Sequence, residues 1–374
     1  MSSATMNRCC AVLVNYFGAA DTAAAALSVL ADAPDTSVLV VDNSHDTAEH
    51  TLLRALLPQA VKVLDAGGNL GFGRACNLAW QASKEEFVLF VNPDVRVLPG
   101  CTIALANTLA SDSTLAAVAP RQYLDSACRW LLPPAWLPTA LRAWSHEKAL
   151  RDPHAWHRLA AAARAEGLRL WEAVTPVAQR ALSGGAFMLR RSALLQQEEP
   201  FDPRFFMYFE DSDLCMRLRR RGLRLAVQPQ AVAVHAWQNL PHKAHMMAEA
   251  AAVYFAKYDP SATNPWHARA AILAATPAGS SNWPAFDLWP ARQGLQVPEA
   301  WHGGWVLELG LSPLLQTVVA RCGTGSVIEE PVEVLSQVGA SGVYGRLSPR
   351  GKSSDQTLPF LYFHWPGGSM ASKC

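Results

Sequence analysis

Amide and carboxylate side chains close three apolar runs of this sequence. The runs and the polar residues at their ends are 9–15 with Asn15, 38–42 with Asp42 and Asn43, and 87–91 with Asn92 and Asp94. Such side chains can hydrogen-bond hydroxyl groups, and a carboxylate can also bind a hard cation such as Mg²⁺. Their repeated placement at the ends of apolar runs predicts one shared binding site, but it does not identify the ligand.

A second group of ionisable residues lies near the middle of the chain. The segment FEDSDL contains Glu210, Asp211 and Asp213, and His235 ends the apolar run 231–235. A carboxylate can act as a general base, whereas an aspartate at the start of a helix can serve only as its cap. Imidazole binds Mn²⁺ better than Mg²⁺, yet a lone histidine is usually an ordinary core or surface residue. Both interpretations of each residue stay open at this point.

Glycines next to polar residues mark two further segments. GGNLGFG contains Asn69 and Gly71, Asn77 follows shortly after it, and Gly185 lies in SGGAF. Glycine lets the backbone approach a ligand closely, but it also suits a plain entry into a helix or tight packing.

The elements that must position these residues alternate between strand and helix. Strands are expected at 9–15, 38–42, 61–65, 87–91, 185–190 and 231–235, and helices at 22–31, 47–57, 73–83, 212–221 and 243–257. Continuous apolar strands separated by helices predict an α/β fold with a mostly parallel central sheet that is covered on both faces. Ligands of such sheets bind beyond the carboxyl ends of the strands, which is where the polar residues fall.

Two regions depart from this alternation. Residues 128–180 carry Trp130, Trp136 and Trp144 and then an Ala- and Arg-rich helical stretch, so they read as an insertion. These tryptophans suit either sugar stacking and lipid contact or the core of the insertion. Short β-like runs at 305–309, 326–334, 343–347 and 360–365 follow a turn-rich stretch near 260–280. We therefore predict a first domain over 8–260 and a small β-rich domain over 275–374, of unknown role.

Four segments, taken in order, resemble a known enzyme family. They are VLVVDNS, GGNLGFGRACN, FVLFVNPDV and SGGAFMLRRSAL…FDPRFFMYFEDSDLCMRLRRRG, followed by His235. Together they resemble the inverting family 2 glycosyltransferases with the GT-A (nucleotide-diphospho-sugar transferase) fold. The nearest likeness is to bacterial rhamnosyltransferases of cell-surface polysaccharide synthesis, and it covers about residues 9–258.

The resemblance implies a role for each candidate residue. Asp211 matches the catalytic base, with Glu210 as the competitor, and Asp94 and His235 match the ligands of a divalent metal ion, Mg²⁺ or Mn²⁺. The family's acidic motif usually has two acids, and Asn92 replaces the first of them here. The residues expected to contact the nucleotide-sugar are Asn15, Asp42, Asn43, Asn69, Gly71, Asn77, Asn92 and Gly185.

The resemblance also implies the partners. The donor is a dTDP-, UDP- or GDP-linked sugar, rhamnose among the candidates, and the acceptor is a glycan or lipid-linked glycan. A binding protein of the same fold without turnover is the alternative. A Rossmann enzyme would need GxGxxG at the first strand–helix turn, and CCAVLVNYFGAAD lacks it.

The amino-acid composition reduces the possible classes of protein further. The 374 residues include 32 Lys and Arg against 31 Asp and Glu, a balance that argues against coating nucleic acid. Eight cysteines without a CxxC pair, and the absence of a signal-peptide pattern, lead us to expect a cytoplasmic protein. Peripheral contact with the inner face of the cell membrane stays open, and the sequence does not decide the oligomeric state.

Overall fold

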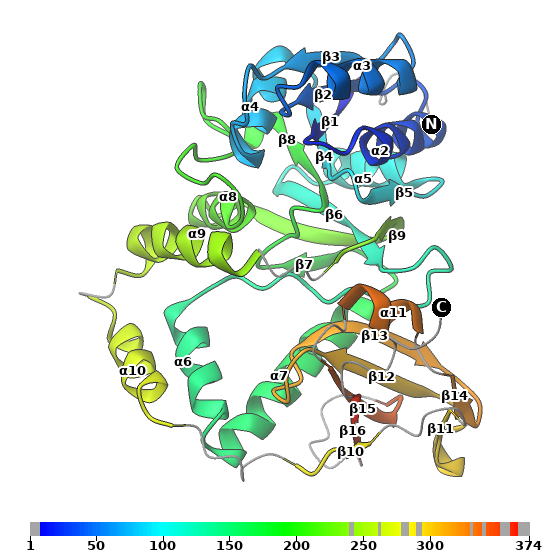
Figure 1. The fold of residues 1–374 in the computed structure, drawn as a ribbon, viewed down its shortest axis with the longest axis vertical. Coiled ribbons are helices and arrows are strands. Elements are labelled where there is room, and N and C mark those ends of the chain that lie inside the picture. Colours follow the sequence, from blue (N-terminus) through cyan, green and yellow to red (C-terminus); the bar gives the residue numbers. More distant parts are fainter. Residues whose placement is uncertain are drawn as a thin grey trace.

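The computed structural model describes residues 8–238, 243–260, 263–277, 284–288, 294–329, 332–338, 342–351 and 360–365. Figure 1 shows a large sheet flanked by helices and a smaller sheet below it. The strands of the large sheet lie in the order β3-β2-β1-β4-β8-β6-β9-β5, and β7 pairs with β9. The α/β fold class predicted from the sequence is confirmed.

The first half of the large sheet is parallel, because a helix follows each of its strands and returns the chain to the same edge. The strands are β1 (Cys9–Asn15), β2 (Ser37–Asp42), β3 (Lys62–Asp65) and β4 (Phe87–Val91), and the helices are α2 (Ala19–Asp32), α3 (Thr47–Leu56) and α4 (Phe72–Ala82). Buried apolar residues pack on both faces of this half, which explains why its strands are apolar throughout. These four strands and three helices were all predicted.

The second half of the sheet is mixed. It consists of β5 (Val95–Val97), β6 (Leu115–Tyr123), β7 (Val177–Gln179), β8 (Ala186–Arg190) and β9 (Arg224–His235), with α5 (Cys101–Ser111) after β5. β8 runs antiparallel to β4 and β6, whereas β6 and β9 are parallel. Two helices complete this half, α8 (Glu210–Arg220) and α9 (Lys243–Tyr258).

The insertion and the C-terminal region pack together. The insertion contains α6 (Ala140–Ala149) and α7 (Pro153–Trp171), and α10 (Pro265–Ala274) packs on α6. The smaller sheet has the order β10-β16-β15-β12-β13, and β11 pairs with β14. These strands are β10 (Asp287–Leu288), β11 (Leu295–Gln296), β12 (Trp305–Gly310), β13 (Thr317–Gly323), β14 (Val327–Ile328), β15 (Val343–Pro349) and β16 (Leu361–Trp365). The division into domains of residues 8–260 and 275–374 stays a prediction.

The strand predicted at residues 326–334 of this region is confirmed only in part. Residues 326–334 were expected to form a strand, but among the described residues of this range only β14 is extended, and α11 (Val332–Val338) comes after it. Val334 and Leu335 are both buried in the core of the smaller sheet. Two adjacent buried positions suit a short helix, whereas a strand would place them on opposite faces.

A buried ion group joins α7 to the smaller sheet. Glu308 of β12 accepts hydrogen bonds from Arg346 of β15, at 2.9 and 2.7 Å, and from Arg164 of α7. All three side chains are almost fully buried. Burial opposes ionisation of Glu308, but the two guanidinium groups outweigh it and hold the pKa of this carboxyl below its usual value. Each charge is therefore compensated only while α7 and the sheet stay together.

Candidate active site

Strand register brings the predicted polar residues to one edge of the large sheet. Asn15 pairs with Asp42 across β1 and β2. Further along the edge, Val91 pairs with Ala186 across β4 and β8, so Asn92 lies beside Gly185 and its N–H donates to the Gly185 carbonyl at 2.9 Å. The carboxyl ends of β1, β2 and β4 thus meet as predicted.

Asp42 is buried and fully hydrogen-bonded. Its Oδ1 accepts from the Asn15 amide at 3.2 Å and from the Ser44 hydroxyl at 2.6 Å, and its Oδ2 lies 2.9 Å from His50 Nδ1. Burial would raise the pKa of Asp42, but these hydrogen bonds outweigh it and keep the pKa below its usual value. Asp42 is therefore a fixed carboxylate. The ring of His50, which the sequence analysis did not single out, is the more exposed group here.

The glycine-rich loop is held against β2 by side-chain amides. Asn43 donates to Asn69 at 3.0 Å and accepts from the Leu70 N–H at 2.8 Å. Gly71 has φ of 80°, and a Cβ there would clash with the carbonyl of Phe206. The expected glycine is thus required for packing against the segment before α8.

Asn77 lies apart from the other candidates. Its amide donates to the Phe201 carbonyl at 2.7 Å and its oxygen accepts from the Phe201 N–H at 3.1 Å. A further contact to Glu199 uses the remaining amide hydrogen. These bonds tie α4 to the segment before α8, so the structure gives Asn77 a structural task.

Asp94 and His235 meet through the pairing of β5 with β9. Val95 is the register partner of His235, and His235 Nε2 lies 3.4 Å from Asp94 Oδ2. On the other side of the ring, His235 Nδ1 lies 2.8 Å from the Gln122 amide oxygen. The two ring nitrogens of His235 therefore contact different groups, Nδ1 the Gln122 amide and Nε2 the Asp94 carboxylate. Gln122, on β6, carried no signal in the sequence.

Two acceptor atoms facing each other fit a cation between them. Asn92 adds a buried side-chain oxygen that has no hydrogen-bond partner. Within the described ranges, no group of three or more His, Cys, Asp and Glu residues is gathered around one point. Mg²⁺ and related ions commonly take few protein ligands and complete their shell with water and substrate phosphate oxygens. The residues present therefore fit a metal ion that is shared with a phosphate ligand.

Asp211 lies in the first turn of α8, next to the small residues before β8. Its Oδ2 accepts from the Gly184 N–H at 2.9 Å, and its Oδ1 from the Ser212 N–H at 2.6 Å. Burial raises the pKa of Asp211 above its usual value, although these backbone hydrogen bonds oppose the rise. A fixed carboxylate with a raised pKa is suited to accept a proton.

Glycines separate Asp211 from His235. A Cβ on Gly184 would lie 3.2 Å from Asp211 Oδ2, and a Cβ on Gly185 would lie 2.5 Å from His235 Cε1. Larger side chains here would push the imidazole or the carboxylate aside. Small residues at these two positions thus have a direct steric cause.

Asp211 and His235 line one cavity of about 340 Å³. Gln122 also lines this cavity, and the insertion contributes further lining residues, including Leu132 and Trp136. Of the three tryptophans predicted in the insertion, Trp130 is buried in the core of the smaller sheet, whereas Trp136 and Trp144 are half-buried. Only Trp136 borders this cavity.

Glu210 is adjacent to Asp211 in sequence but faces α4. Glu210 is 6% exposed, and its Oε2 has no hydrogen-bond partner. A Cβ on Gly73 of α4 would lie 3.7 Å from the Glu210 Cβ. Burial, with the charge of Asp211 adding to it, raises the pKa of Glu210 to about 8.

This raised pKa predicts a pH-dependent stability. Between the usual pKa of 4.5 and about 8, the folded protein holds a proton on Glu210 that the unfolded chain releases. The contribution of the Glu210 carboxyl to the free energy of unfolding is therefore fully present below pH 4.5 and is lost as the pH rises to 8. We expect Glu210→Gln to raise the free energy of unfolding at pH 8 by on the order of a few kcal/mol, at about 1.4 kcal/mol per pKa unit. Urea unfolding of the wild-type protein and the Glu210→Gln variant at pH 5 and pH 8 measures this effect. A difference in the free energy of unfolding that is equal at the two pH values would contradict the prediction.

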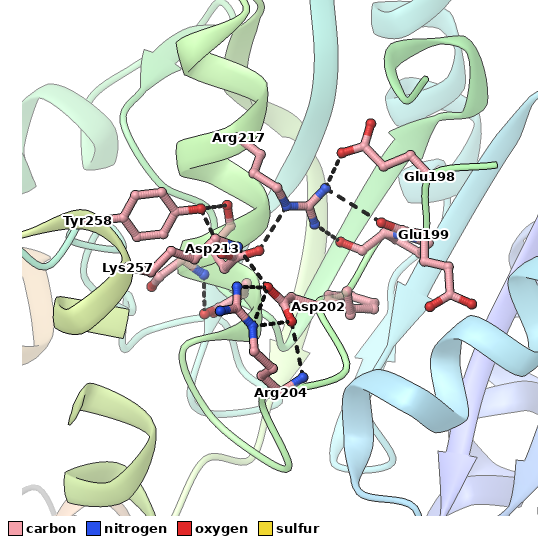
Figure 2. A network of polar contacts seen from close by, with 12 residues as sticks. Glu198, Glu199, Asp202, Arg204, Asp213, Arg217, Lys257 and Tyr258 are labelled. Carbon is pink, nitrogen blue, oxygen red and sulfur yellow. Dashed lines mark hydrogen bonds and ion pairs between the residues drawn. The ribbon is translucent and has the colours of Figure 1, made fainter. Parts of the chain in front are cut away.

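A polar network holds the helix that carries these two carboxyls (Figure 2). Asp213 is fully buried and accepts from Arg217 at 2.8 Å, from Tyr258 at 2.7 Å and from Lys257 at 2.5 Å. The last two residues belong to α9, so the network fastens α9 to the first turn of α8. These contacts give Asp213 a structural role.

The backbone just before α8 is also constrained. Tyr208 and Phe209 have φ of 70° and 65°, a left-handed conformation that costs on the order of 1–3 kcal/mol per residue outside glycine. The Asp213 network on one side and the Phe206 contact with Gly71 on the other maintain it. The strained turn directs Asp211 into the cavity and Glu210 toward α4.

The sequence of this chain is similar to one family model and to two known rhamnosyltransferases. The family model "Glycosyltransferase like family 2" matches residues 19–256. An "N-acetylglucosaminyl-diphospho-decaprenol L-rhamnosyltransferase" of Mycobacterium tuberculosis (strain CDC 1551 / Oshkosh) is 31% identical over 233 residues, 59% of this chain and 71% of the relative. "Rhamnosyltransferase WbbL" of Escherichia coli (strain K12) is 45% identical over 51 residues, 14% of this chain and 19% of that protein.

A solved structure of GalNAc-T7 with UDP, GalNAc and Mn²⁺ is 17% identical, with a TM-score of 0.47. The likeness covers 72% of this chain and 52% of that one. Among the described residues, no helix has the length and apolar character needed to cross a membrane.

Proposed function

This chain belongs to glycosyltransferase family 2, and we propose that it transfers a sugar, with inversion, from a nucleoside-diphospho-sugar to a hydroxyl group of a glycan or lipid-linked glycan. The observation that carries the proposal is the shared cavity of Asp211 and His235, a carboxylate with a raised pKa beside an imidazole whose Nε2 lies 3.4 Å from Asp94. The rhamnosyltransferase-like sequence makes dTDP-rhamnose the first donor to test, with UDP- and GDP-sugars as the other candidates.

In the proposed reaction, Asp211 takes the proton of the acceptor hydroxyl. The acceptor oxygen forms a bond to the anomeric carbon as the bond from that carbon to the diphosphate oxygen breaks, and the nucleoside diphosphate leaves. The Gly184 N–H fixes the carboxylate, and Gly184 and Gly185 leave the space in which the sugar reacts. Attack from the side opposite the leaving group inverts the anomeric centre.

Asp94 and His235, with the unpartnered oxygen of Asn92 close by in sequence, are the groups proposed to hold a Mg²⁺ or Mn²⁺ ion. Such an ion offsets the negative charge that develops on the diphosphate leaving group. Gln122 keeps the imidazole of His235 in the tautomer that can bind a cation.

The nucleoside is proposed to bind at the neighbouring strand ends. Asn15, Asp42, Asn43 and the Asn69 loop form a continuous hydrogen-bonded rim there. Because protein groups already contact both oxygens of the Asp42 carboxylate, we propose that it orders this rim and that the exposed His50 ring is a further donor-site contact. A cytoplasmic setting, at the inner face of the membrane for a lipid-linked acceptor, belongs to the same proposal.

A panel of nucleotide-sugars tests the function. We expect one nucleotide class, in the presence of Mg²⁺ or Mn²⁺, to raise the melting temperature by about 2–4 °C for each kcal/mol that ligand binding adds to the stability of the folded protein, and the matching sugar donor to be hydrolysed slowly or transferred. Stabilisation without any turnover would favour the carbohydrate-binding alternative. No stabilisation by any nucleotide-sugar would contradict the proposed function.

A further inference from the structure

The segment of residues 202–213 carries the proposed base and also contacts the glycine-rich loop. Asp211 lies near the end of this segment, and the carbonyl of Phe206 accepts a hydrogen bond from the Phe72 N–H at 2.9 Å, beside Gly71. The direction of the Asp211 carboxylate therefore depends on how this one segment is held.

The start of α8 does not fix the segment by itself. Its N-cap residue is Phe209, which has φ of 65° and whose side chain makes no capping hydrogen bond. A serine, threonine or aspartate at this position would tie the first turn to the preceding backbone. The orientation of the first turn must therefore come from contacts with other elements.

Two carboxylates hold α8 from different sides. Successive residues of an α-helix are rotated by about 100°, so Asp211 and Asp213 point about 160° apart around the axis. On one side, Asp211 Oδ2 accepts from the Gly184 N–H at 2.9 Å. On the other side, Asp213 accepts from Lys257 at 2.5 Å and from Tyr258 at 2.7 Å, and both of these residues belong to α9. These contacts together fix the rotation of the first turn.

Lys257 joins the two ends of the segment. Its Nζ lies 2.7 Å from Asp202 Oδ2 and 2.5 Å from Asp213 Oδ1 (Figure 2). The side chain of Lys257 is 21% exposed, that of Asp202 is 13% exposed and that of Asp213 is fully buried, so little water competes for these contacts. We refer to this arrangement of Lys257 with the two aspartates as the Lys257 bridge.

Aromatic side chains support the segment between these ends. Tyr254 of α9 is fully buried in one cluster with Phe205, and its ring centroid lies 5.4 Å from that of Phe209. Phe209 is one of the two residues in the left-handed conformation before α8. The helix α9 thus packs against the strained turn and, through Lys257, connects its two ends.

We propose that Lys257 is a positioning residue for Asp211. By holding Asp202 and Asp213 together, Lys257 sets the rotation of the first turn of α8 and so the direction from which the Asp211 carboxylate meets the acceptor hydroxyl. Lys257 is not among the described residues that line the Asp211 cavity, so it acts through Asp213. This inference rests on the proposed function, which it deepens by naming a residue outside the cavity on which the base depends.

Replacing Lys257 with methionine, which removes the charge and keeps an unbranched side chain, tests the role. We expect kcat with the donor selected by the nucleotide-sugar panel to fall by about 10–100-fold, because a misplacement of about 1 Å can cost this much. Affinity for the nucleoside diphosphate, measured by calorimetry, should change little, since the proposed nucleoside rim is bonded within β1, β2 and the glycine-rich loop. Lys257→Arg restores the charge and should recover most of the lost kcat.

Arg204→Gln is the matched control for the loss of a cation from this segment. Arg204 pairs with the same Asp202 at 2.6 Å, but its side chain is 59% exposed and its described ion pair is with Asp202 alone. An exposed ion pair contributes little, so this variant should change kcat by less than about twofold.

A double-mutant cycle shows whether Lys257 acts through Asp213. Asp213→Asn should also lower kcat, and the combination with Lys257→Met should cost less than the product of the two separate losses. If Lys257→Met does not fold, Tyr258→Phe takes its place, because it removes one hydrogen bond to Asp213 from the same helix and keeps the ring. The melting temperature of each variant checks its folding.

Amide hydrogen exchange tests the Lys257 bridge without any turnover. The peptide that covers residues 202–213 should exchange at least about tenfold faster in Lys257→Met than in the wild-type protein, because local opening of the first turn of α8 becomes easier. In Arg204→Gln its exchange should stay close to the wild-type rate.

Three results would overturn the inference. Unchanged kcat in a folded Lys257→Met protein would show that the base does not depend on Lys257, and unchanged exchange of residues 202–213 would show that the bridge does not hold the segment. An equal loss of kcat in Arg204→Gln would show a general charge effect. A wild-type protein that turns over no nucleotide-sugar would refute the proposed function instead, and the exchange rates would then decide on the bridge alone.

Discussion

Replacing Asp211 with asparagine is expected to lower kcat for sugar transfer by about 10²–10⁴-fold, the usual contribution of a general base. Asparagine keeps the size of the side chain and an oxygen that can accept from the Gly184 N–H, so the site should keep its shape. Donor affinity should change little, because Asp211 contacts the acceptor in the proposed reaction. Steady-state kinetics and nucleotide titrations of the variant measure the two effects separately.

Glu210→Gln is the matched control, because it removes the neighbouring carboxyl from the same helix turn. Glu210 faces α4, so this variant should keep kcat within tenfold of the wild-type value. The reverse pattern, with Glu210→Gln inactive and Asp211→Asn active, would assign the base to Glu210.

Replacing Asp94 with alanine is expected to raise the concentration of Mg²⁺ or Mn²⁺ needed for half-maximal activity by about 10–100-fold or more, since even the groups that orient metal ligands contribute that much. His235→Ala should also raise the metal concentration needed for half-maximal activity, but by a smaller factor. A carboxylate contributes charge to the metal site that a neutral imidazole does not. Activity measured over a metal titration gives both values.

The Asp21→Asn variant is the control for the loss of one negative charge in general. Asp21 pairs at 3.2 Å with Arg96, which follows Asp94 by two residues and lies on β5. Asp21→Asn removes the same charge and should leave the metal requirement within about twofold. Full wild-type activity in excess chelator would contradict the metal proposal.

The first half of the fold could be predicted because each local pattern agreed with the tertiary structure. CCAVLVN, VLVVD and FVLFV are apolar at every position, as strands buried on both faces must be. β9 was predicted only from residue 231, whereas it begins at Arg224. Gln228, Pro229 and Gln230 interrupt its apolar pattern, and the register with β6 shifts near there, which no single-sequence pattern reveals.

The candidate site was predictable where residues follow directly from a strand end or a helix start. Asp42, Asp94, Asp211 and His235 all occupy such positions. Their partners could not be found in this way. Gln122 reaches His235 only through the pairing of β6 with β9, and Lys257 reaches Asp213 only through the docking of α9. These contacts span 113 and 44 residues of sequence, so they depend on tertiary structure alone.

The buried Arg164–Glu308–Arg346 group has a consequence for any shortened form of this protein. A chain cut after residue 260 would retain Arg164 without the carboxylate that neutralises it, and removing one partner of a buried ion pair costs about 3–5 kcal/mol. The cut would also uncover Leu168 and Trp171, which share a core with Val306 and Ala320 of the smaller sheet. We therefore expect the two halves to depend on each other for stability and to melt in a single cooperative transition.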